Sequence, residues 1–167
     1  MIRTWTPESD APKLPTGPDY RTVKAWFQQC RTLAAAVEAQ REKIQRIRDV
    51  AGKCTQSLSG LPGGGSGGDE VGFAVERLDT EQRELCRMEQ QLRKLNMEAT
   101  HRAAFLCGTE RARRQADCIF RYYVLNERQR TVAEKLGFSN PTGVSVYIRD
   151  GFKTLAEIWA DIQNDGE

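Results

Sequence analysis

Histidine is almost absent from the chain, which contains only His101, and its five cysteines include no pair at a CxxC spacing. Structural zinc sites are assembled from clustered cysteines and histidines, so the sequence predicts no metal site. We expect the cysteines to be buried, reduced thiols. Because there is no second histidine and no nucleophile elbow, we expect neither an enzyme nor a bound cofactor, and we assign no catalytic residue.

The sequence also lacks long apolar runs and the pattern of a secretory signal peptide. A membrane-spanning helix needs about 18 or more consecutive, mainly apolar residues, and no such run is present. We therefore expect a cytoplasmic protein that does not enter a membrane.

A strong excess of one charge is absent as well, since 25 Lys and Arg residues oppose 23 Asp and Glu residues, for a net charge of +2. Residues 109–160 are more basic, with nine basic and six acidic side chains, whereas residues 161–167 hold three acidic side chains and no basic one. Basic side chains bind nucleic acid by neutralising its phosphates. The C-terminal third is therefore basic enough to bind DNA, although we expect a single copy to bind weakly.

A long helix is predicted over residues 20–58, with Asp19 as a suitable N-cap. Heptads counted from Val23 make ten of eleven a and d positions apolar, and Gln40 is the exception. An apolar seam that persists over this length predicts a coiled coil rather than an isolated globular helix.

A second long helix is predicted over residues 71–107. Heptads counted from Val71 make nine of eleven a and d positions apolar, with Glu81 and Arg102 as the exceptions. The two apolar spans are equally long, at 36 residues each. We expect the helices to fold back on each other as an antiparallel coiled-coil hairpin. The sequence leaves open whether they pair within one chain or between chains, as a homo-oligomer.

Proline and glycine mark the segments that are not predicted to be helical. Residues 1–19 contain four of the six prolines and are expected to form a flexible arm. Residues 57–69 contain six glycines and one proline, which predicts a flexible linker over residues 59–70. Asp69 is a suitable N-cap for the helix that follows. A phosphate-binding loop is not predicted there, because no Gly-Lys-Ser/Thr motif follows the glycines.

A third helix is predicted over residues 110–125, since Gly108 can end the second helix and Thr109 can cap the next. Its inward-facing side chains are expected to be Ala112, either Cys118 or Ile119, Tyr122 and Leu125. Three arginines at its start are candidates for phosphate contacts or for solvated surface residues, namely Arg111, Arg113 and Arg114.

Two shorter helices with a glycine turn between them are predicted next. Asn126 is a suitable N-cap for a helix over residues 127–136, with Gln129 as its capping-box partner. Gly137 ends this helix, because glycine readily adopts the left-handed conformation at a helix C-terminus.

The last helix of this pair begins after a cap at Asn140, with Pro141 at its first position. One of its faces is apolar and is formed by Val144, Ile148, Phe152 and Leu155. The order of helix, short turn and capped helix predicts a DNA-binding helix-turn-helix within a domain over residues 108–162.

The run TVAEKLGFSNPTGVSVYIRDGFKTL, residues 131–155, resembles the region-four helix-turn-helix of sigma factors, although its NPTG turn is one residue longer than usual. Together with the glycine-rich break and the heptad helix before it, residues 55–160 resemble phage and prophage transcriptional regulators of the RinA and ArpU type. The resemblance implies that the protein binds double-stranded DNA of a promoter or control region in the cytoplasm of a bacterial host cell. It also implies contact with RNA polymerase.

The helix-turn-helix assignment identifies candidate DNA-binding residues. Arg149 is suited to bidentate hydrogen bonds with guanine O6 and N7, and Gly143 would let the backbone approach the DNA closely. The residues expected to face the major groove are Asn140, Thr142, Gly143, Ser145, Val146, Arg149 and Lys153. The residues expected to hold phosphates are Arg128, Arg130 and Lys135.

Two other functions fit the same pattern. A phage small terminase subunit also joins a helix-turn-helix to helical oligomerisation segments, and it would recognise packaging DNA as a closed ring of subunits. A helical interaction module without DNA binding is the second alternative. The modest charge of the C-terminal third and the presence of Asp150 on the presumed DNA face keep this alternative open.

Overall fold

The computed structural model describes residues 19–58 and 67–164, and describes side chains for residues 19–53 and 72–162. Its described residues form helices and no strand, which confirms the expected all-α class. The arm over residues 1–18 and most of the predicted linker lie outside the described residues. The helices, in chain order, are α1 (Tyr20–Leu58), α2 (Gly67–Ala104), α3 (Glu110–Ile119), the π-helix η1 (Phe120–Val124), α4 (Gln129–Leu136), α5 (Pro141–Glu157) and α6 (Trp159–Asn164).

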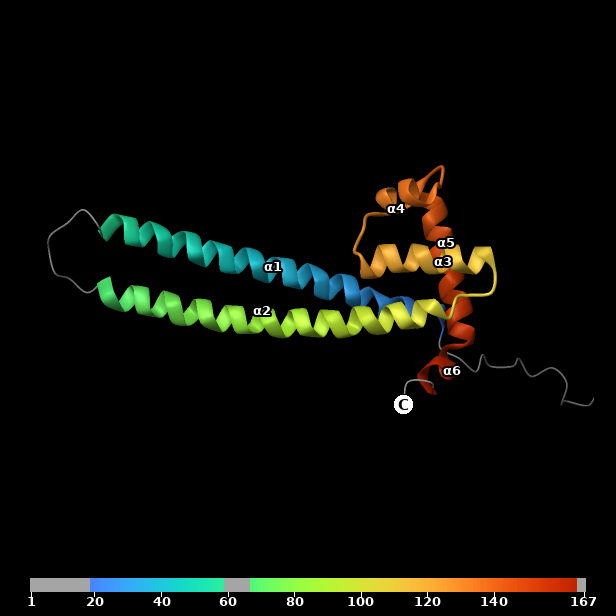
Figure 1. Ribbon diagram of the computed structural model, residues 1–167, viewed down its shortest axis with the longest axis horizontal. Coiled ribbons are helices and arrows are strands. Elements are labelled where there is room, and N and C mark those ends of the chain that lie inside the picture. The colour runs from blue at the N-terminus through green and yellow to red at the C-terminus, as the bar shows by residue number, and fades with distance from the viewer. Residues whose placement is uncertain (1–18, 59–66, 165–167) are drawn as a thin grey trace, which may run out of the picture.

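The two long helices α1 and α2 lie side by side and run in opposite directions, and α3 to α6 gather at one end of them (Figure 1). Along α1 the heptad a positions are buried, at Val23, Cys30, Val37 and Ile44. The d positions Leu33 and Ile47 are only half-buried. Two helices cover each other on one side alone, so the core of the α1–α2 pair stays thin wherever no third helix covers it.

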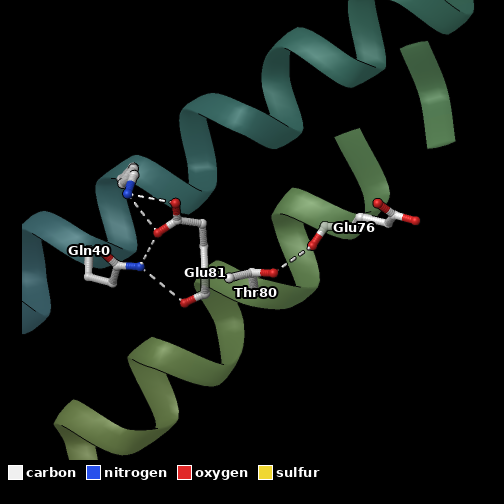
Figure 2. A network of polar contacts seen from close by, with 5 residues as sticks. Gln40, Glu76, Thr80 and Glu81 are labelled. Carbon is white, nitrogen blue, oxygen red and sulfur yellow. Dashed lines mark hydrogen bonds and ion pairs between the residues drawn. The ribbon is translucent and has the colours of Figure 1, made fainter. Parts of the chain in front are cut away.

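The polar exceptions in the two heptad patterns meet across the α1–α2 pair, as Figure 2 shows. The Gln40 amide donates hydrogen bonds to the Glu81 carboxylate at 2.7 Å and to the Glu81 carbonyl oxygen at 3.1 Å. Lys43 Nζ lies 2.6 Å from a carboxylate oxygen of Glu81. A shift of one helix along the other would place these groups against apolar side chains without partners, so the contact selects one register.

The third exception, Arg102, lies where the α1–α2 pair meets the C-terminal helices. Its guanidinium is 4.2 Å from the centre of the Trp26 ring and 4.6 Å from that of Trp159, and it also pairs with Glu98. A cation between two aromatic faces is stabilised by both ring quadrupoles. Arg102 therefore joins α1, α2 and the start of α6.

Arg31 makes a second junction between α1 and the C-terminal helices. Its Nη1 donates to the carbonyl oxygens of Tyr122 and Glu127, and its guanidinium lies 4.0 Å from the centre of the Tyr122 ring. Nearby, the fully buried Phe27 packs its ring 5.9 Å from that of Tyr123 and 5.3 Å from that of Phe152. These contacts hold the first turns of α1 firmly against η1 and α5.

The predicted inward face of the third helix is partly wrong, because the helix changes pitch. Both Cys118 and Ile119 are buried, but Tyr123 is buried in place of Tyr122, and Leu125 is 48% exposed. The Leu125 N–H donates to the carbonyl of Phe120, five residues earlier, at 3.1 Å. A π-turn adds one residue relative to an α-helical turn and so rotates all later side chains around the axis.

Both ends of α2 differ from the prediction, whereas the start of α3 agrees with it. The helix α2 begins at Gly67, so Asp69 lies inside its first turn rather than at the cap, and two linker glycines are helical. It ends at Ala104, before the expected Cys107, and Gly108 adopts a φ of +95° in the turn that follows. Thr109 caps α3 as predicted, with its side chain accepting from the Ala112 N–H.

The predicted cap at Asn126 is wrong. Asn126 has a φ of +55°, whereas an N-cap requires an extended backbone. Arg128 instead occupies the cap position of α4, without a side-chain cap hydrogen bond. The Glu127 N–H donates to the carbonyl of Arg121, so the chain closes a turn on η1 before α4 begins. No helix in the described part of the chain is long and apolar enough to cross a membrane.

Candidate functional site

The turn between α4 and α5 is built from local signals that act in sequence. Gly137 ends α4 in the left-handed conformation at a φ of 69°, and the Phe138 N–H donates to the carbonyl of Ala133. The Asn140 side chain then accepts from the Gly143 N–H at 3.0 Å, and Pro141 opens α5. These contacts satisfy backbone groups that helix ends would otherwise leave without partners. As a result, the first turn of α5 projects from the surface in a defined orientation.

Phe138 fills this turn and explains the glycine that follows. The centre of its ring lies 5.0 Å from that of the Tyr147 ring and 5.1 Å from the Arg114 guanidinium. A Cβ atom added to Gly143 would come within 2.9 Å of Phe138 Cδ1. Glycine at this position thus makes room for the ring, a role that the sequence did not predict.

The apolar face of α5 packs against the rest of the molecule. Its predicted members Val144, Ile148, Phe152 and Leu155 are all buried. Gly151 lies on the same face, where an added Cβ would meet Ile119 at 3.0 Å, Gln115 at 3.2 Å and Leu106 at 3.3 Å. The close approach of α3 at Gly151 holds α5 with its polar face turned outward.

The candidate DNA-contacting residues of α5 lie on or beside this outward face. Val146 is 37% exposed and Ser145 is half-buried. The Arg149 side chain is 54% exposed, and its Nε lies 3.6 Å from a carboxylate oxygen of Asp150. The remaining exposed members are Asn140, Thr142 and Lys153. The structure therefore brings the predicted residues together along one side of a single helix.

Part of this face borders a groove of about 470 Å³ that could not be predicted from the sequence pattern. Thr142, Ser145 and Arg149 contribute one wall of the groove. The start of α1 contributes the other through Tyr20, Lys24 and Gln28, and Gln129 and Tyr122 also line it. Helical periodicity reports the face of one helix and not which distant helix will lie opposite, so the contribution of α1 carries no signal in the sequence.

The three predicted phosphate-binding residues have different surroundings. Arg130 pairs with Glu134 at 3.2 Å, and Lys135 pairs with Glu127 at 2.5 Å. Arg128 is exposed, and among the described residues its side chain has no ion pair. The Arg130–Glu134 pair is exposed, and surface ion pairs contribute about 0–1 kcal/mol, so a phosphate can replace Glu134 at little cost. The Glu127 side chain is only 14% exposed, but it also lies 3.7 Å from Arg121 and so keeps a cationic partner when Lys135 turns to a phosphate.

The arginine cluster at the start of α3 is mostly engaged within the protein. Arg114 donates to the carbonyl of Leu136 at 2.8 Å, at the end of α4. Arg111 pairs with Asp150 at 2.9 Å, so Asp150 lies between two arginines, Arg111 and Arg149. The acidic group on this face is therefore compensated. Arg113 is exposed and, in the part of the chain that the structure describes, has no ion pair.

The expectation that the cysteines are buried holds for only some of them. Cys30 and Cys118 are buried, and desolvation raises the pKa of each thiol to about 11. Cys86 and Cys107 are exposed, which corrects the expectation for these two, and the side chain of Cys54 lies outside the described residues. Within the described ranges, no group of three or more His, Cys, Asp or Glu side chains is arranged to hold a metal ion.

Comparison with known proteins gives no match of any kind: no protein-family model, no curated protein and no solved structure matches this chain.

Proposed function

We propose that this protein is a sequence-specific DNA-binding regulator of transcription, of the phage and prophage RinA and ArpU type. In this proposal, α4, the turn over residues 137–140 and α5 form a helix-turn-helix similar to region four of sigma factors. The observation that carries the proposal is the division of α5 into a fully buried apolar face and an outward polar face that includes Arg149 and Lys153.

The polar face of α5 has the chemistry for reading base edges. The major groove of B-DNA, about 12 Å wide, admits one α-helix. Arg149 would donate two hydrogen bonds to a guanine, while the hydroxyl of Thr142 and the exposed Val146 would contact other base edges or a thymine methyl group. Asn140 is committed to the cap of α5, so its role would be to hold the first turn in place for these contacts.

Phosphate contacts would flank this helix. Arg128 and Arg113 have no ion-pair partner among the described residues and would bind phosphates directly. Arg130 and Lys135 would exchange Glu134 and Glu127 for phosphate oxygens. Such contacts position the protein on the duplex without reading its sequence, and they make binding sensitive to salt.

The α1–α2 pair would serve as an antiparallel coiled-coil hairpin for self-association or for contact with RNA polymerase. Its half-buried heptad positions, such as the a positions Leu85 and Leu92 on α2, leave apolar surface that a further helix would cover. Its polar contact between Gln40 and Glu81 keeps one register while that surface is presented.

The test is a binding titration of the full-length protein by fluorescence anisotropy. One duplex carries the control region beside the protein's own gene, and a second carries the same bases in shuffled order. We expect tighter binding to the first duplex, with a log–log dependence on salt concentration that is linear and negative for both. Equal affinity for the two duplexes would contradict sequence-specific recognition, and no binding at low salt would contradict DNA binding altogether.

A further inference from the structure

Most of the side chains that line the groove between α1 and α5 can donate to an anion, and the exceptions are Val146, Ile148 and Phe152. Two of the donors are cationic, Lys24 and Arg149, and several carry hydroxyl or amide groups: Tyr20, Gln28, Tyr122, Gln129, Thr142 and Ser145. None of the residues lining the groove is acidic. A phosphodiester carries one negative charge and only acceptor oxygens, so this set of groups matches a nucleic-acid backbone.

Lys24 is the cationic residue that α1 contributes to this groove. Its side chain is exposed, and among the described residues it makes no ion pair and no hydrogen bond. Arg130 and Lys135, by contrast, already hold carboxylates. A phosphate that binds Lys24 therefore displaces no protein partner, and the cost of binding is limited to ordering the lysine side chain.

The backbone that carries Lys24 is held in place relative to α5. The residues on either side of it, Val23 and Phe27, are fully buried, and the Phe27 ring packs 5.3 Å from that of Phe152 on α5. Arg31, two turns further along α1, hydrogen-bonds the backbone of η1 and of the loop after it. Because these contacts exist before DNA arrives, the distance between Lys24 and the polar face of α5 is set in advance.

We propose that the groove between α1 and α5 holds the phosphate backbone of one DNA strand beside the major groove that α5 enters, with Lys24 as the phosphate-binding cation. This inference rests on the proposed function and adds to it a second wall of the binding site, supplied by the first long helix. The α1–α2 pair is then part of the DNA-binding surface, and its direction relative to the duplex is fixed by that contact.

The test compares full-length Lys24→Ala with Lys53→Ala, a control that removes an exposed lysine near the opposite end of α1 (Figure 1). We expect Lys24→Ala to weaken binding to the specific and the shuffled duplex by the same factor, about tenfold, as for the loss of one charge-assisted hydrogen bond. The slope of log affinity against log salt should fall by about 1. Lys53→Ala should change neither quantity, and Lys24→Arg should retain most of the affinity.

A neutral phosphate in the DNA provides the second arm. Methylphosphonate groups are placed one at a time along the specific duplex, and each duplex is bound by the wild-type protein and by Lys24→Ala. We expect one position where neutralisation weakens the wild type but not the variant, which identifies the phosphate held by Lys24. Provided that the wild type binds DNA, either of two results would overturn the inference. One is the absence of any such position, and the other is a Lys24→Ala protein that binds DNA as Lys53→Ala does. A wild type that failed to bind either duplex would overturn the proposed function as well.

Discussion

In the proposed complex with DNA, Arg149 is the residue that would recognise a base most directly. Its side chain is half-exposed on the outward face of α5, and its contact with Asp150 at 3.6 Å holds the guanidinium close to the helix surface. Asp150 has a second partner in Arg111, at 2.9 Å, so Arg149 can leave it without exposing an unpaired carboxylate. The Arg149 guanidinium could therefore leave Asp150 for the guanine contact that we propose.

We expect Arg149→Ala to weaken binding to the specific duplex by ~1–3 kcal/mol and to relax the preference at one base pair. Binding to a panel of duplexes, each with one substituted base pair, measures both effects. Arg48→Ala, which removes an exposed arginine on α1, is the matched control and should leave the preference unchanged. Equal weakening on every duplex would instead identify Arg149 as a phosphate contact.

Gly151 allows the tight contact between α3 and α5. An added Cβ would lie 3.0 Å from Ile119 and 3.2 Å from Gln115, and both neighbours are buried. We expect Gly151→Ala to lower the free energy of unfolding by about 1–3 kcal/mol, the usual cost of overpacking a core. Urea denaturation followed by circular dichroism measures the change in midpoint.

The matched control is Gly72→Ala in α2, where an added Cβ would meet nothing within 4 Å. Alanine has a higher helix propensity than glycine, so the free energy of unfolding of this variant should rise by up to about 1 kcal/mol. A Gly151→Ala protein with an unchanged or raised midpoint would show that α3 and α5 can separate without cost.

Among the helices, the α1–α2 pair shows how polar residues can organise an apolar seam. The hydrogen bonds and the ion pair from Lys43 and Gln40 lower the pKa of the Glu81 carboxyl below its ordinary value of 4.5. A lowered pKa in the folded state means that the ionised carboxylate stabilises the fold. This stabilisation is complete above pH 4.5 and is lost as the pH falls through the lower pKa of the folded state.

We expect Glu81→Gln to melt at a lower temperature than the wild type at neutral pH, because the amide keeps a partner for Gln40 but cannot pair with the Lys43 ammonium. The gap should close as the pH falls below the pKa of Glu81 in the folded protein. Thermal melts from neutral pH down to pH values below 4.5 test this. Glu84→Gln, on the exposed side of the same helix, is the control and should show no gap. A gap for Glu81→Gln that stayed constant with pH would contradict the assigned role of its charge.

For the whole molecule, the central relation is that between the α1–α2 pair and the C-terminal helices. Arg102 between Trp26 and Trp159, and Arg31 against the loop after η1, join the two parts at one end of the pair. The rest of the pair extends away from this junction (Figure 1). The proposed DNA-binding face at one end and the long helical surface at the other would suit a protein that connects a DNA site to a second binding partner.

Light scattering of the full-length protein, with and without the duplex from beside its own gene, tests the whole assembly. We expect one or two chains in solution and a salt-dependent shift in mass with that duplex, as for a regulator. A closed ring of many subunits would instead favour a small terminase subunit that recognises packaging DNA. A dimer that ignores DNA at low salt would favour an interaction module, with the α1–α2 pair as its functional surface.

The all-α class and much of the local structure follow from the amino-acid sequence alone. The caps at Thr109 and Asn140, the left-handed Gly137 and the buried face of α5 were all predictable. Each depends on residues within one or two turns of each other, because helix propensity, capping and periodicity are interactions of near neighbours. The burial of the a positions of α1 was predictable for the same reason, since these positions repeat along one helix.

Contacts between residues far apart in the chain depend on how the helices pack, and they could not be predicted from the sequence pattern. The π-turn that buries Tyr123 in place of Tyr122, the left-handed Asn126 and the cation between two tryptophans follow from packing between helices. The groove between α1 and α5 has the same origin, since Lys24 and Arg149 come together only when both helices pack on one core. Local preferences of a few tenths of a kcal/mol to about 1 kcal/mol per residue are outweighed by such burial, and for that reason the second wall of the candidate site was absent from the sequence pattern.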